Sequence, residues 1–174
     1  FRGYKVLGRC LVFAEVGRGG MGAVYRGRHL TFTYPFDCAV KCLLGAAEVE
    51  RFEREATLGA ELSHENLVRV FDTGSVGGLR YLVMEWIEGE SATDLAARHS
   101  DGVPIEVAVE LGRQACEGLA IVHDRGVIHR DIKPSNLMIA DTGTVKVVDL
   151  GIAKRAEAAF HTHAGAVFGT PQFM

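Results

Sequence analysis

The first half of the chain contains short, largely apolar runs that glycine-rich or polar segments separate, and one of them, Ala23–Arg28, alternates apolar and polar residues. Such alternation over about four to eight residues is typical of strands with one buried face. The pattern predicts an antiparallel sheet of five strands within residues 1–85, with a loop at 31–35 and a hairpin turn at 74–78. The predicted strands are Cys10–Val16, Ala23–Arg28, Asp37–Leu44, Leu67–Thr73 and Leu79–Glu85.

Two longer segments, Glu48–Leu62 and Ile105–Asp124, place apolar residues three or four positions apart. This spacing puts them on one face of a helix, so we predict a helix in each segment. The second helix should end at Gly126, because glycine readily adopts the left-handed conformation that closes a helix. Its expected buried residues are Val107, Leu111, Ala115, Leu119 and Val122. Short strands are predicted after it at Val127-Ile128, Leu137–Ala140 and Val145–Val148.

Composition, charge and cysteine spacing indicate which class of protein this is. The 174 residues are 48% hydrophobic and 24% charged, which is typical of a globular chain. The net charge of −3 argues against a nucleic-acid partner. No apolar run approaches the roughly 18 residues that span a bilayer, and no secretory leader is visible. The four cysteines form no Cys-x-x-Cys pair, so we expect a cytoplasmic protein with reduced thiols.

The segment Gly-Arg-Gly-Gly-Met-Gly at 17–22 matches the pattern G-x-G-x-x-G. A plain hairpin is the simpler interpretation of this pattern alone. In dinucleotide-binding folds these glycines open a helix, whereas here they join two predicted strands. That context favours a flap whose backbone amides cover phosphates.

Lys41 lies within a predicted strand, between apolar neighbours. An exposed edge lysine is one interpretation, and a lysine that neutralises phosphate is the other. Glu55 lies beside the apolar face of the first predicted helix, and a carboxylate there needs a cationic partner. Lys41 is a candidate for that partner.

The polar segment His-Arg-Asp-Ile-Lys-Pro-Ser-Asn at 129–136 lies between predicted strands. A solvated loop could have this composition, but the order of the residues is specific. Asp149 follows the last predicted strand and precedes Leu-Gly, as suits a metal ligand at the end of a buried strand. Two histidines at 161 and 163 suggest a metal pair, but no cysteine or acid near them completes a zinc set.

In this order and spacing, the motifs resemble those of the eukaryotic-like serine/threonine protein kinases of bacteria, from about Cys10 to Met174. The resemblance implies an α+β bilobal fold of the protein-kinase type. We expect a complete N-lobe at 1–85, with the five-stranded sheet and one helix, and a hinge at 86–90. A partial helical C-lobe is expected at 91–174, truncated before any Ala-Pro-Glu segment.

The resemblance also implies cofactors, ATP and Mg²⁺, with Mn²⁺ as a substitute, and a role for each matching residue. Lys41, oriented by Glu55, would hold the α/β-phosphates. Asp131 would orient the substrate hydroxyl or accept its proton, and Lys133 would stabilise the phosphoryl group during transfer. Thr170 would form a hydrogen bond near these two residues. Asn136 and Asp149 would bind Mg²⁺. The expected ATP-binding residues are Val16, Gly17, Arg18, Gly19, Gly20, Met21, Gly22, Val24, Ala39, Lys41, Met84, Glu85, Ile87 and Met138.

Lys133 two positions after Asp131 favours Ser/Thr hydroxyls of proteins as substrates, again by resemblance. Arg130 beside Asp131 implies control by a phosphate on the activation loop, for which Thr162 is the candidate site. The resemblance admits a homodimer through the kinase domain. Two other functions stay open: a nucleotide-binding pseudokinase that acts as a scaffold, and a small-molecule phosphotransferase of related fold. The resemblance also implies that the backbone of Glu85-Trp86-Ile87 pairs with adenine, and the Trp86 side chain is interpreted as a packing or flap residue.

Overall fold

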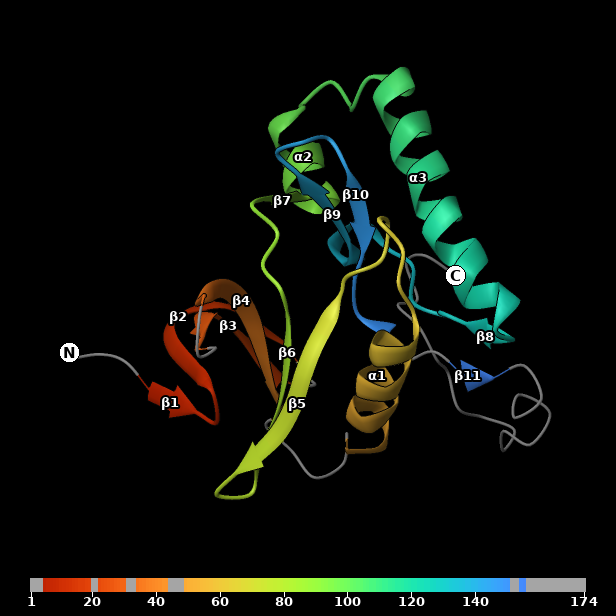
Figure 1. Cartoon of the computed structure of the whole chain (residues 1–174). Coiled ribbons are helices and arrows are strands. Elements are labelled where there is room, and N and C mark those ends of the chain that lie inside the picture. Colours follow the sequence, from red (N-terminus) through yellow and green to blue (C-terminus); the bar gives the residue numbers. More distant parts are fainter. Residues whose placement is uncertain (1–4, 20–21, 31–33, 44–48, 151–153, 156–174) are drawn as a thin grey trace. The chain divides into compact units, whose positions relative to one another are not determined.

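The structure, a computed structural model, describes residues 5–19, 22–30, 34–43, 49–150 and 154–155 (Figure 1). Within helix α1 the side chains of 50, 51, 54 and 55 are outside the description. The chain divides into two compact units. The first unit comprises Phe1–Ala60 and Arg69–Trp86, and the second comprises Glu61–Val68 and Ile87–Met174.

The first unit is built on an antiparallel sheet of six strands, in the order β1-β2-β3-β4-β6-β5. All five predicted strands are present. The sixth, β1, is a three-residue edge strand that is too short to give a periodic signal in the sequence. The strands are β1 (Lys5–Leu7), β2 (Cys10–Gly19), β3 (Gly22–His29), β4 (Phe36–Leu43), β5 (Val70–Val76) and β6 (Leu79–Glu85).

The two faces of this sheet bury different side chains, because successive residues of a strand point to opposite sides. One face carries a core cluster with three buried cysteines, Cys10, Cys38 and Cys42. On the other face, Leu43 and Leu82 pack with Phe52 of helix α1 (Val49–Glu61). Figure 1 shows α1 lying alongside β5. The predicted helix is therefore confirmed, and it covers the face on which Lys41 lies.

Strand β5 begins three residues later than predicted. Leu67 and Val68, at the start of the apolar run, belong to the second unit, where the Val68 N–H donates to the Val147 carbonyl oxygen at 3.0 Å. The predicted turn at 74–78 is also too long. Only Gly77 and Gly78 form it, with φ of 57° and 82°, as a two-residue hairpin turn requires.

The second unit contains helices α2 (Ala92–Arg98) and α3 (Ile105–Asp124) and the 3₁₀ turn η2 (Pro134–Asn136). Its strands form two small sheets, in the orders β10-β9-β7 and β11-β8. Figure 1 shows α3 running beside β10. The strands are β7 (Gly89–Ser91), β8 (Val127–Ile128), β9 (Leu137–Ala140), β10 (Val145–Val147) and β11 (Lys154–Arg155).

Helix α3 has the predicted bounds, but its buried stripe is shorter than expected. Ala115, Gly118 and Val122 are buried, whereas Val107 is 40% exposed. The prediction for Val107 is wrong because the contacts that bury α3, with β10 and the Asn66 loop, lie further along the helix. The apolar periodicity continues beyond the part that packs. No helix in the described part of the chain is both long and apolar enough to cross a membrane.

Helix α2 was not predicted. Ser91 precedes it, and its Oγ accepts the N–H of Asp94 at 3.1 Å while the Asp94 carboxylate accepts from the Ser91 N–H. This reciprocal pair is a capping box. The sequence Ser-Ala-Thr-Asp carried that signal, but the helix is only two turns long and shows little apolar periodicity.

Candidate active site

Five of the predicted nucleotide-binding residues lie in two adjacent rows across the first sheet. In the first row Gly17 of β2 is opposite Val24 of β3, and Val24 is opposite Lys41 of β4. In the second row Ala39 of β4 is opposite Met84 of β6. Directly opposite residues of an antiparallel pair share a face. The structure therefore brings Val24, Lys41, Ala39 and Met84 together on the side of the sheet that α1 covers.

Lys41 is only 7% exposed, so it is not the exposed edge lysine that was the alternative. Its neighbour across the sheet is Leu82, an apolar residue of the α1-facing core. An ammonium group in such a place needs an anionic partner. Glu55 lies in α1, but its side chain is outside the described residues, so its pairing with Lys41 stays a prediction.

The glycines of the flap differ in their surroundings. A Cβ added at Gly22 would lie 2.0 Å from the Cys42 carbonyl oxygen, so this position accepts only glycine for packing reasons. A Cβ at Gly17 or Gly19 would meet nothing within 4 Å, which leaves open space above the backbone there. Gly20 and Met21 lie outside the described residues.

Arg18 and Val16, also predicted to bind nucleotide, are surface residues of β2. The Arg18 guanidinium donates to the Glu15 carboxylate at 2.6 and 2.8 Å, and this contact lowers the pKa of Glu15. Val16 is 50% exposed and lies in the bulge between Glu15 and Gly17.

The predicted hinge begins at the end of β6. The Glu85 N–H donates to the Arg69 carbonyl oxygen at 2.9 Å, and its carboxylate accepts the Arg69 N–H at 2.7 Å. Trp86 follows, with the Arg26 guanidinium 4.7 Å from the centre of its ring. Ile87 is the first residue of the second unit beyond this point and is half-buried.

The polar loop of the second unit is held together by its own side chains. Lys133 Nζ lies 2.8 Å from Asp131 Oδ2, and Asp131 is 7% exposed. Asn136, placed by η2, donates from Nδ2 to the Asp131 carbonyl oxygen at 2.8 Å and to its Oδ2 at 3.3 Å. Three predicted site residues are thus brought into direct contact.

Val148 connects this loop to the predicted metal ligand Asp149. Its N–H donates to the Asn136 carbonyl oxygen at 3.0 Å, and its carbonyl oxygen lies 3.1 Å from His129 Nε2. Asp149, the next residue, has a φ of 71°. Arg130 has a φ of 67°. Left-handed backbone costs a non-glycine residue about 1–2 kcal/mol, and such strain is concentrated at functional sites.

His129 is 1% exposed, and burial lowers its pKa from the ordinary value of 6.5. Its Nδ1 accepts the Asp131 N–H at 3.3 Å, so in the neutral ring the proton is on Nε2, which donates to Val148. Leu150, which follows Asp149, is 2% exposed and belongs to the buried core.

The remaining predicted residues divide into two groups. Met138 lies in β9, opposite Lys146 and Ser91, and is half-buried. Thr162 and Thr170 lie outside the described residues, so nothing in the structure tests their predicted roles.

Sequence reasoning missed a second buried network in the same unit. Asn66, 2% exposed, donates from Nδ2 to the Val145 carbonyl oxygen at 2.8 Å and to Gln114 Oε1 at 3.2 Å. Gln114 Oε1 also accepts the Val145 N–H at 2.8 Å. Four polar residues, 63–66, separate Leu62 from Leu67, so no local pattern singles out Asn66 as buried.

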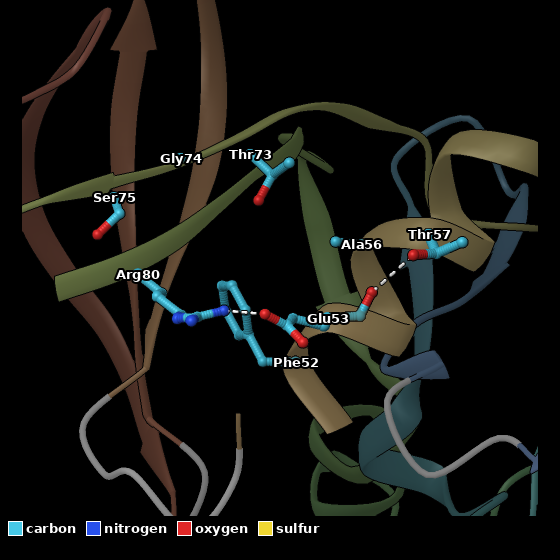
Figure 2. A pocket seen from close by; sticks show the side chains of 8 residues that line it. All are labelled: Phe52, Glu53, Ala56, Thr57, Thr73, Gly74, Ser75 and Arg80. Carbon is cyan, nitrogen blue, oxygen red and sulfur yellow. Dashed lines mark hydrogen bonds and ion pairs between the residues drawn. The ribbon is translucent and has the colours of Figure 1, made fainter. Parts of the chain in front are cut away.

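The first unit has a pocket of about 510 Å³ between α1 and the β5–β6 hairpin (Figure 2). Figure 2 shows Arg80 pointing across it toward Glu53, with which it forms an ion pair. Thr57 Oγ1 donates to the Glu53 carbonyl oxygen at 2.9 Å. The two charges of the pocket satisfy each other, and none of its lining residues is among the predicted site residues.

Known proteins resemble this chain along most of its length. The model of the protein kinase domain matches residues 11–174. A probable serine/threonine-protein kinase of Clostridium perfringens is 37% identical over 97% of this chain and 25% of its own length. The serine/threonine-protein kinase PknB of Mycobacterium leprae is 40% identical over 91% of this chain and 27% of its own. The serine/threonine-protein kinase Pkn1 of Myxococcus xanthus is 38% identical over 92% of this chain and 24% of its own length.

The chain spans about a quarter of the length of the curated relatives it matches. The family match covers nearly all of the chain, including both units and every described residue of the site. The chain therefore belongs to the protein kinase domain family, and the relatives it resembles are bacterial serine/threonine-protein kinases.

Proposed function

We propose that the protein is an ATP-dependent protein kinase that transfers the γ-phosphoryl group of MgATP to Ser and Thr hydroxyls of proteins. The observation that carries the proposal is the contact set of Asp131, Lys133 and Asn136, continued to Asp149 through Val148. These residue types suit phosphoryl transfer, which depends on positioning and charge stabilisation.

The loop supplies oxygen ligands for a hard cation. Asn136 uses its amide nitrogen as a donor to Asp131, which leaves its Oδ1 as an acceptor, and Asp149 adds a carboxylate. Oxygen ligands of this kind are those that Mg²⁺ takes. When bound, Mg²⁺ would neutralise phosphate charge. Lys41, buried on the sheet face with Val24 and Ala39, would hold the α/β-phosphates.

Asp131 would receive the substrate hydroxyl. Its carboxylate is buried and contacts the Lys133 ammonium at 2.8 Å, so an anion and a cation lie side by side at one point of the loop. The anion can orient the hydroxyl and accept its proton. The cation can stabilise the charge of the phosphoryl group as it is transferred.

Substrate class, regulation and location are further parts of the proposal. The relatives' names support Ser/Thr specificity. Arg130, next to Asp131, would receive a phosphate on Thr162 that is added by autophosphorylation. Mass spectrometry of active protein should find Thr162 modified, and an unmodified Thr162 in that sample contradicts this part.

The four free cysteines support a cytoplasmic, reducing location. Self-association would be measured by ultracentrifugation.

The test is transfer of radiolabelled phosphate from ATP to a basic protein substrate. We would assay this chain and a chain extended beyond Met174, each beside its Asp131→Asn variant. Transfer that depends on Asp131 is the expected result. Binding of ATP without any transfer by the extended chain would instead support the pseudokinase function, and transfer only to a small molecule would support the phosphotransferase.

A further inference from the structure

Trp86 is held at the end of β6 by a cationic side chain of β3. The Arg26 guanidinium carbon lies 4.7 Å from the ring centroid of Trp86, within the range of a cation–π interaction. Trp86 is half-buried, and its Nε1 has no hydrogen-bond partner among the described residues. The indole is therefore held through its face and by packing rather than through a hydrogen bond.

Arg26 is itself fixed by Asp37 of β4. The two side chains form an ion pair at 2.9 Å, and each is about one-third exposed. Arg28 contacts the other oxygen of the same carboxylate at 2.8 Å. The two guanidinium groups hold the pKa of Asp37 below its ordinary value, so this carboxylate stays charged. A guanidinium that is oriented by an ion pair loses less freedom when it stacks on an aromatic ring.

The position of Arg26 in the sheet connects this contact to two of the residues expected to bind ATP, Ala39 and Met84. Arg26 is directly opposite Ala39, and Ala39 is directly opposite Met84, so the three residues form one row on one face of the sheet. Trp86 follows Met84 by two residues. Arg26 therefore has Ala39 as its neighbour across the sheet and Trp86 as its stacking partner, and Met84 lies between these two along the chain and the row.

We propose that Arg26 is a positioning residue for nucleotide binding: through Trp86 it fixes the backbone of residues 85–87, which would bond the adenine. This inference rests on the proposed function. The other end of that backbone is already fixed, because the Glu85 N–H donates to the Arg69 carbonyl oxygen. Without Arg26, the chain beyond Glu85 loses its side-chain restraint from β3.

Trp86 makes the test direct, because it is the sole tryptophan of the chain. Its fluorescence would be recorded during titration of the 174-residue chain with ATP, and the Kd would be checked by equilibrium dialysis with radiolabelled ATP. We expect Arg26→Leu to shift the emission to longer wavelength. We expect it also to raise the Kd for ATP about three- to tenfold, the scale of one cation–π contact.

Arg28→Leu is the matched control, since it removes a neighbouring guanidinium from the same carboxylate but not the one stacked on Trp86. It should leave both the emission and the Kd unchanged. Arg26→Lys keeps the charge and should restore part of the affinity. In a Trp86→Ala chain, Arg26→Leu should have no further effect on the Kd, which a general loss of stability would not reproduce.

The outcomes separate the inference from the proposed function. If the parent chain binds ATP and Arg26→Leu binds it with the same Kd, the positioning role is wrong and the proposed function is unaffected. If Arg26→Leu weakens binding equally in the Trp86→Ala chain, the effect does not pass through Trp86 and the inference is also wrong. If dialysis detects no ATP on the parent chain or on the chain extended beyond Met174, the proposed function fails and takes the inference with it.

Discussion

His129 Nε2 donates to the carbonyl oxygen of Val148 at 3.1 Å, while His129 Nδ1 accepts the N–H of Asp131. One neutral imidazole thus joins the loop that carries Asp131 to the residue before Asp149. Protonation would turn Nδ1 into a donor that faces another donor. The structure of the site therefore depends on the charge state of this buried ring.

Stability should fall as the pH falls below about 6.5. Burial lowers the pKa of His129 in the folded chain, so below 6.5 the unfolded chain binds a proton that the folded chain does not. The slope from this one group is at most about 1.4 kcal/mol per pH unit. Urea unfolding between pH 7.5 and 5.5 would measure it. The slope should flatten in His129→Asn and persist in His123→Asn, an exposed residue of α3. An unchanged slope in His129→Asn would contradict the attribution of this pH dependence to His129.

Asp131→Asn should reduce phosphoryl transfer by about 10²–10⁴-fold, because the amide cannot accept the proton of the hydroxyl. The amide has nearly the shape of the carboxylate, so ATP binding should stay close to that of the parent. Transfer rates and dialysis on the same samples measure both quantities in the extended chain. A variant that transfers phosphate as fast as the parent would show that Asp131 is not the base.

Lys41→Met should reduce the rate of transfer by two or more orders of magnitude, roughly the effect of removing one preorganised charge from a transition state. Methionine fills most of the same volume, so the buried position stays packed. Lys5→Met on β1, an exposed residue, is the control and should leave the rate unchanged. Equal rates in the Lys41→Met variant and the parent would refute the phosphate-binding role.

Gly22→Ala should destabilise the chain by about 1–3 kcal/mol, because its Cβ would lie 2.0 Å from the Cys42 carbonyl oxygen. Gly19→Ala, where a Cβ meets nothing within 4 Å, should change stability by less than about 0.5 kcal/mol. Urea midpoints of the two variants would be compared. Equal midpoints would mean that the close approach of β3 and β4 at Gly22 is relieved at no cost.

Asn66→Ala should cost about 1–3 kcal/mol, because it leaves the buried Val145 carbonyl oxygen without the 2.8 Å donor that Asn66 supplies. Glu65→Ala is the control: its side chain is exposed, and the bond from Lys146 goes to its backbone carbonyl oxygen, which the variant keeps. Thermal unfolding of both variants would measure the difference. Similar melting temperatures would show that water satisfies Val145 in the variant.

The elements that the sequence predicted well are those with a long, uninterrupted apolar signal. The strand Leu79–Glu85 has the predicted bounds because its apolar run from Tyr81 to Met84 is bounded by polar or glycine residues, and the helix Ile105–Asp124 has them because the 3–4 spacing continues along its length. Leu67 was assigned to the wrong element because its apolar character does not say which unit buries it. In the structure it forms a parallel bridge with Val147.

For the candidate site, order and spacing predicted the residues but not their contacts. Lys133 and Asp131 are only two positions apart, yet the sequence did not predict the ion pair that their side chains form. The contact of Arg26 with Trp86 joins two strands far apart in the sequence, and it depends on the register of β3, β4 and β6. No local pattern reports such a register, so the sequence did not predict that Arg26 contacts Trp86.

The path of the chain between the two units affects how the protein can be divided for experiments. The chain passes from one unit to the other after Ala60, after Val68 and after Trp86. A fragment cut at Trp86 would therefore carry Leu67 and Val68 without the partners that leave them 1% and 4% exposed. An isolated sheet unit for crystallography or screening would need these apolar residues replaced by polar ones, or the loop 61–68 redesigned.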